Sequence, residues 1–87
     1  MQIVHYIPHP RYKITVFRSG NRFVVKFDDS DHDLAFKFRE GEVSNVSDIE
    51  AWVDEQLLQK VADVFDTLSQ FRAQRFKSYS VDYPDII

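Results

Sequence analysis

The chain of 87 residues contains no cysteine, carries a formal net charge of −3 and is 44 % hydrophobic. This length suits a single domain with a small core, and the hydrophobic content is too high for a disordered segment. The lack of cysteine excludes disulfides, thiolate metal ligands and cysteine nucleophiles. The chain starts without the features of a signal peptide, and no stretch reaches the roughly 18 apolar residues of a membrane span. We therefore expect a cytoplasmic protein that makes no membrane contact.

Charge is distributed unevenly along the chain. Residues 1–39 hold seven Lys or Arg against four Asp, whereas residues 40–69 hold eight Asp or Glu against Lys60 alone. Residues 70–87 hold three basic against two acidic side chains. The first part of the chain is therefore basic and the middle part acidic.

Two segments that alternate between apolar and polar residues, 11–18 and 22–27, predict a β-hairpin. Gly20 and Asn21 suit its two-residue loop, because glycine accepts a positive φ at the first loop position. This loop sets a register in which the apolar faces coincide, so that Val16 lies opposite Val25 and Ile14 opposite Phe27.

A further alternating segment, 34–39, predicts the next strand of an antiparallel meander. We expect it to pair Phe27 with Leu34, Val25 with Phe36 and Phe23 with Phe38, which makes one face a Phe-rich core. Residues 3–7 are a possible fourth strand, which Pro8 and Pro10 would separate from the first or confine to an edge.

The spacing of Ser47 and Glu50 is that of a capping box and predicts a helix start there. No Pro or Gly interrupts residues 48–76, and one helix of that length would span about 43 Å against about 27 Å for a strand of the sheet. The helix must therefore overhang, bend or break. Its apolar residues form two stripes, one of Ile49, Trp52, Val53 and Gln56, and a rotated one of Leu57, Val61, Val64, Leu68 and Phe71, flanked by Leu58 and Phe65. Either a kink near Gln56 separates two helices, or a single helix meets two partners.

These elements predict an α+β fold, in which an antiparallel β-meander of three to four strands is followed by one long or kinked amphipathic helix packed on one sheet face. We assign residues 1–79 to a single domain and residues 80–87 to a C-terminal tail. Tyr79, Val81 and Tyr83 alternate as in a strand, so this end of the chain is either a frayed terminus or a strand added to a sheet edge.

The acidic residues Asp29, Asp31, Asp33 and Glu40 have the spacing of a twelve-residue calcium loop. However, Leu34 stands where such a loop needs Gly for its sharp turn. We interpret the cluster as a solvated polar turn and expect no specific calcium site.

No other set of residues predicts an active site. His5 and His9 lie in an extended segment, where their spacing does not direct both rings to one point, even with His32. The serines lie in turn, cap, helix or tail positions, and there is no Gly-rich phosphate loop. We therefore predict a domain that is not an enzyme and binds no metal or cofactor, and we rank a small-ligand or enzymatic function last.

Two surfaces predict binding instead. The later helical stripe, Leu57, Val61, Val64, Leu68 and Phe71, steps by four and three residues, as in a helix-packing seam, and offers more apolar surface than the sheet can cover. This predicts a non-catalytic interaction domain that forms a homodimer through its helix or binds an unidentified protein partner.

The alternative is single-stranded nucleic-acid binding on the outer sheet face. That face combines cations with an aromatic platform, formed by Lys13, Phe17, Lys26, Lys37 and Arg39 beside Thr15 and Val24. In its strand-strand-strand-helix order the chain also resembles a single repeat of the Pur-alpha or Whirly type. This likeness of topology implies helix-mediated dimers that bind single strands on the sheet.

Overall fold

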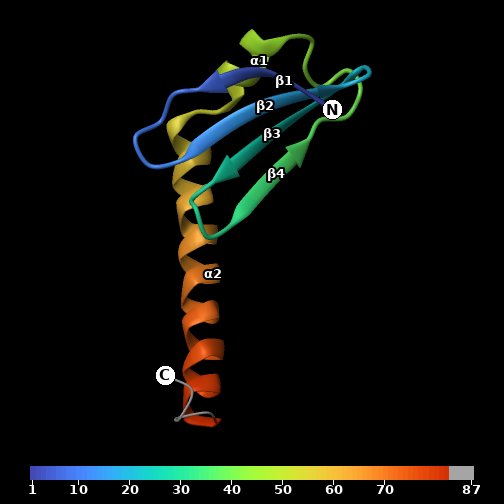
Figure 1. Cartoon of the computed structure of the whole chain (residues 1–87). Coiled ribbons are helices and arrows are strands. Elements are labelled where there is room, and N and C mark those ends of the chain that lie inside the picture. Colours follow the sequence, from blue (N-terminus) through green and yellow to red (C-terminus); the bar gives the residue numbers. More distant parts are fainter. Residues whose placement is uncertain (83–87) are drawn as a thin grey trace.

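The structure, a computed structural model, describes residues 1–82 and the side chains of residues 1–76. Four strands precede two helices: β1 (Gln2–Ile7), β2 (Lys13–Ser19), β3 (Arg22–Asp28), β4 (Asp33–Lys37), α1 (Val46–Trp52) and α2 (Glu55–Asp82). The strands form one antiparallel sheet in the order β1-β2-β3-β4 (Figure 1). The predicted α+β meander followed by a helical segment is confirmed.

The β2–β3 hairpin has the predicted register. Gly20 and Asn21 form its loop, and Gly20 has a φ of 62°, a left-handed conformation that glycine adopts without steric cost. The pairs that face the core are those expected from the apolar alternation, Val16 with Val25 and Ile14 with Phe27.

The neighbouring strands complete the meander. β4 pairs with β3 as predicted, with Leu34 opposite Phe27 and Phe36 opposite Val25. It ends at Lys37, although the N–H of Phe38 still donates to the carbonyl of Phe23 at 3.0 Å. The possible fourth strand is present as β1, which forms the edge beside β2 and shifts register between Ile3 and His5.

The helical segment is broken rather than continuous. Asn45 caps α1, since its side chain accepts a hydrogen bond from the N–H of Asp48 at 2.9 Å. The predicted cap at Ser47 is therefore wrong by two positions, because Asn45 offers an equivalent acceptor earlier in the chain. α1 ends at Trp52, and Asp54 opens α2 by accepting from the N–H of Leu57 at 2.9 Å. Of the two alternatives, the kinked one is confirmed, with its break two residues before Gln56.

Both helices pack on the Phe-rich face of the sheet. The core joins sheet residues to Ile49 and Val53 from the first stripe and to Val61 and Phe65 from the second. α2 crosses behind the sheet and continues well past its edge, which gives the molecule extents of 54 × 27 × 21 Å (Figure 1). The sheet, α1 and the beginning of α2 thus form a compact head, and the rest of α2 projects from this head as a helical stem.

The chain is helical as far as Asp82. Residues 79–82 continue α2, so of the two alternatives for this end of the chain the added strand is wrong over these residues. The backbone here follows the uninterrupted helix that precedes it, which contains no Pro or Gly. Tyr83 lies outside the described residues, and the boundary between the domain and the tail at residue 79 stays a prediction.

Candidate interaction surfaces

Aromatic rings attach the beginning of α2 to the head. Phe65, 3 % exposed, packs edge-on against Tyr12 with ring centroids 5.5 Å apart and stacks on His32 at 5.9 Å. His9 in turn stacks on Tyr12 at 4.8 Å. Val61, one turn before Phe65, is also buried. Residues 55–66, which we call the inner half of α2, are thereby held against the sheet.

The loop between β3 and β4 also contributes to this attachment, because it carries His32, which stacks on Phe65. One Asp29 carboxylate oxygen accepts the backbone N–H groups of Asp31 and His32 at 3.0 and 2.6 Å, and the other lies 3.2 Å from the His32 ring. Desolvation raises the pKa of Asp29, but the hydrogen bonds from His32 and Asp31 and the charge of His32 together hold that pKa below its usual value. The loop therefore presents His32 to Phe65 in a fixed position.

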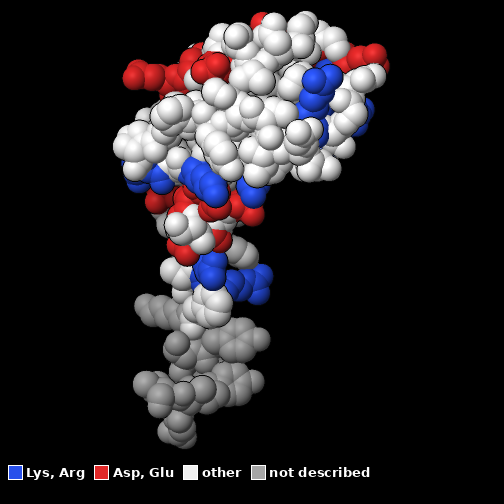
Figure 2. Space-filling model, turned by 45° about the horizontal axis from the view of Figure 1, so that its top comes forward, with Lys and Arg blue, Asp and Glu red and all other residues white. Residues whose placement is uncertain are grey.

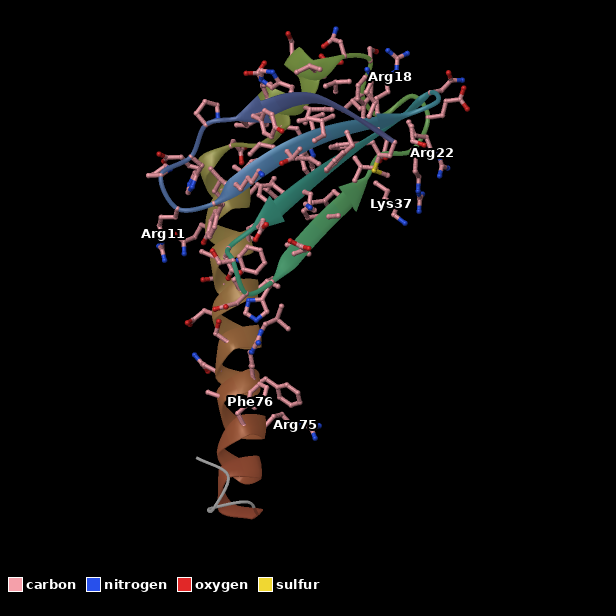
Figure 3. The ribbon with its side chains drawn as sticks, in the orientation of Figure 1. Arg11, Arg18, Arg22, Lys37, Arg75 and Phe76 are labelled. Carbon is pink, nitrogen blue, oxygen red and sulfur yellow. The ribbon has the colours of Figure 1, made fainter. Side chains whose placement is uncertain are left out.

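The remainder of α2 leaves the sheet. Every side chain of residues 67–76, the outer half of α2, is exposed. Its one described polar link to the head runs from the Arg72 guanidinium to the carbonyl of Asp31 at 3.3 Å. The guanidinium of Arg75 lies 4.8 Å from the centre of the Phe71 ring. Figure 3 shows Arg75 and Phe76 on the stem, well away from the strands.

The structure divides the predicted seam into two parts. Val61 is buried in the core and Leu57 is half-buried against it. Val64, Leu68 and Phe71 are 42, 41 and 51 % exposed, and we call these three residues the α2 seam. The seam begins where α2 leaves the sheet, so the part of the predicted stripe that lacks an intrachain cover is its outer part.

The outer sheet face is more apolar than its sequence suggested. Cross-strand pairs set out two rows on this face, one of Tyr6, Thr15, Lys26 and Ala35 and one of Ile3, Phe17, Val24 and Lys37. Lys26 Nζ lies 5.5 Å from the centre of the Phe17 ring, and Lys13 Nζ lies 5.8 Å from that of Tyr6. Figure 2 shows a wide uncharged surface with Lys and Arg mostly near its margins.

Two features of this face were missed from sequence. Tyr6 is a second aromatic platform, 52 % exposed, because β1 pairs with β2 in a register that places Tyr6 opposite Thr15. The alternation of residues 3–7 signalled a strand but not its register. Arg22 lies beside Lys37 at the hairpin end of the sheet (Figure 3), whereas Arg18 pairs with Phe23 on the opposite face.

The other predicted members of the basic face are placed as follows. Lys13 and Lys37 are exposed on β2 and β4, and Phe17 and Lys26 are half-buried. Arg39 follows the end of β4, where its N–H donates to the Glu42 carboxylate, so it belongs to the loop rather than to the sheet face.

A hollow of about 470 Å³ lies beside the end of β4. Its lining includes Phe36, Phe38 and Trp52, and the Trp52 ring meets the two Phe rings edge-on at 5.0 and 4.8 Å. Trp52 is 37 % exposed. Through Ile49, Trp52 and Val53, the first apolar stripe of the helical segment thus packs against the sheet, with Trp52 on its β4 side.

The histidines make local contacts. His9 Nδ1 accepts the N–H groups of Arg11 and Tyr12, both at 3.1 Å, and closes the turn before β2. His5 Nε2 lies 3.5 Å from a Glu50 carboxylate oxygen and links β1 to α1. Among the described residues, no three or more His, Asp or Glu side chains lie close enough together to hold a metal ion.

No helix within the described part of the chain combines the length and the apolar character required to cross a membrane. The chain matches no known family model, no curated protein and no solved structure.

Proposed function

We propose that this protein is a non-catalytic interaction domain that self-associates through the α2 seam. The observation that carries the proposal is the exposure of Val64, near the end of the inner half of α2, and of Leu68 and Phe71 on the outer half, which has left the sheet. Large apolar side chains in a continuous row on one helix face are typical of helix-pairing surfaces. The head supplies a folded base, and the stem supplies the contact surface.

The apolar surface that stays exposed on the α2 seam is enough for weak self-association. Full burial of a large apolar side chain contributes about 1.5–3 kcal/mol, so each half-exposed seam residue has roughly 1 kcal/mol still to gain. Burying three such residues on each of two copies gains a free energy comparable to the free energy that association itself costs. A closed two-fold pair uses the same patch twice and is the commonest oligomer. We therefore expect a weak homodimer whose population rises with concentration.

Sedimentation equilibrium or light scattering across about 10 to 500 μM tests this expectation. The average mass should rise from monomer toward dimer, and Leu68→Asp should hold the protein at the monomer mass. Ala73→Asp is the matched control, since it places the same charge on the opposite side of the exposed outer half. A monomeric mass over the whole range, with native far-UV circular dichroism, would refute self-association.

Single-stranded nucleic-acid binding is the second candidate, and the paired platforms on the outer sheet face favour it. Tyr6 and Phe17 lie on adjacent strands, and each has a Lys ammonium group within 6 Å of its ring. Aromatic rings can stack on bases while lysines contact phosphates.

A fluorescent oligonucleotide tests the second candidate. Its affinity should fall steeply with salt, and reversing Lys26 and Lys37 together to Glu should weaken it while circular dichroism stays native. Lys60→Glu, a charge reversal on the exposed surface of α2, should cost far less. Lack of binding at low salt would exclude this candidate.

A further inference from the structure

We propose that the two copies pair with their α2 helices antiparallel, so that residues 63–66, at the end of the inner half of each helix, lie along residues 73–76 of the outer half of the other. This inference rests on the proposed self-association and adds the orientation of the second copy. The orientation follows from the distribution of charge along α2 and from Arg75, which occupies the next position of the seam after Phe71.

The two halves of α2 carry opposite charge. The inner half holds Glu55, Asp63 and Asp66 against Lys60, and the described outer half holds Arg72 and Arg75 with no acidic residue. Figure 2 shows acidic atoms where the stem meets the head and basic atoms further along it. Antiparallel pairing brings Asp63 and Asp66 of one copy beside Arg72 and Arg75 of the other and also opposes the two helix dipoles, whereas parallel pairing sets like charges side by side.

The seam itself discriminates between the two orientations. Arg75 follows Phe71 at the next position of the four-three pattern, and its guanidinium lies over the Phe71 ring. A parallel pair in register would bring Arg75 of one copy against Arg75 of the other in the contact. An antiparallel pair centred between residues 69 and 70 places Arg75 opposite Val64, beside the acidic Asp63. The same register sets Leu68 of each copy against Phe71 of the other, which joins the two largest seam residues.

The separation of a spin label on Lys60 tests the orientation. Lys60 is exposed on α2 near the head, and the chain has no native cysteine, so Lys60→Cys gives a single labelling site that leaves the seam and Arg75 intact. In the antiparallel register the two labels are about 28 Å apart along the helix axes. In a parallel pair in register they are under about 20 Å apart, because paired helices lie 8–10 Å from each other. Double electron–electron resonance on a dimeric sample should show the longer distance.

Disulfide formation between two variants provides a second measurement. Val64 and Arg75 lie about 16 Å apart along one helix, beyond the span of a disulfide. A mixture of Val64→Cys and Arg75→Cys chains should therefore form mixed disulfides in the antiparallel pair, whereas each variant alone should cross-link poorly. Efficient cross-linking of Val64→Cys with itself, together with a short label distance in a protein of dimeric mass, would overturn the orientation and leave self-association standing. A protein of monomeric mass would overturn both.

Discussion

The inner and outer halves of α2 share one apolar periodicity but have different surroundings. In the inner half, Val61 and Phe65 are buried against Tyr12, His32 and the Phe-rich sheet face. In the outer half, Leu68 and Phe71 continue a row of the same kind and are exposed. The difference arises because the helix crosses the sheet and continues past its edge. A regular apolar stripe thus indicates that a helix has partners, while the length of the sheet decides which part of the stripe lacks one within the chain.

The largest expected effect comes from truncating the same residue type in the two halves. Phe65→Ala removes a buried ring that contacts Tyr12 and His32, and we expect it to lower the free energy of unfolding by about 3–5 kcal/mol. Phe71→Ala removes a half-exposed ring and should cost the monomer less than about 1 kcal/mol. Urea denaturation of dilute protein measures both. Equal losses for the two variants would contradict the division of α2 into an anchored half and a projecting half.

A smaller effect is expected at the start of the inner half. Asp54 accepts the Leu57 N–H and begins α2, so Asp54→Ala should cost about 1 kcal/mol of unfolding free energy. Ser47→Ala is the control, because Asn45 rather than Ser47 caps α1, and it should cost a few tenths of a kcal/mol at most. A larger loss at Ser47 than at Asp54 would restore the capping box that the sequence suggested.

The register of the sheet was predictable because a two-residue glycine loop and coinciding apolar faces leave one solution, with Val16 against Val25 and Phe27 against Leu34. The helix cap was not, since Asn45 and Ser47 are both acceptable acceptors and their local patterns do not rank them. Nor could periodicity alone divide the predicted seam between Val61 and Val64, because burial there depends on where α2 crosses the sheet. Tyr6 was missed because a strand register shift is a property of pairing, not of one segment.

A stabilising substitution is expected in the loop that supports the inner half. Ser30 has a φ of 82°, a left-handed conformation that costs a residue with a Cβ about 1–2 kcal/mol relative to a right-handed one. Ser30→Gly relieves this strain but gives the unfolded chain more freedom, so we expect a net gain of less than about 1 kcal/mol. Ser44→Gly, at an exposed loop position without positive φ, serves as the control and should not stabilise the protein. A clear loss of stability in Ser30→Gly would show that its backbone is not strained.

The smallest expected effect is on the pH dependence of stability, and it arises from Asp29 in the loop that holds His32 against the inner half of α2. The pKa of Asp29 lies below its usual value because hydrogen bonds from His32 and Asp31 favour the carboxylate over the acid, despite desolvation. The unfolded chain then binds a proton more readily than the folded one, so this carboxylate stabilises the protein above the unfolded pKa of about 3.9.

That contribution is lost as the pH falls through the lower, folded value. We expect Asp29→Asn to be less stable than the wild type near neutral pH and the difference to shrink at acid pH, as measured by urea unfolding at a series of pH values. Asp31→Asn removes one negative charge from an exposed position in the same loop, and its difference from the wild type should vary less with pH. A difference for Asp29→Asn that grows on acidification would mean that His32 and the loop do not hold Asp29 as a carboxylate. Another interaction would then have to hold the His32 ring against Phe65.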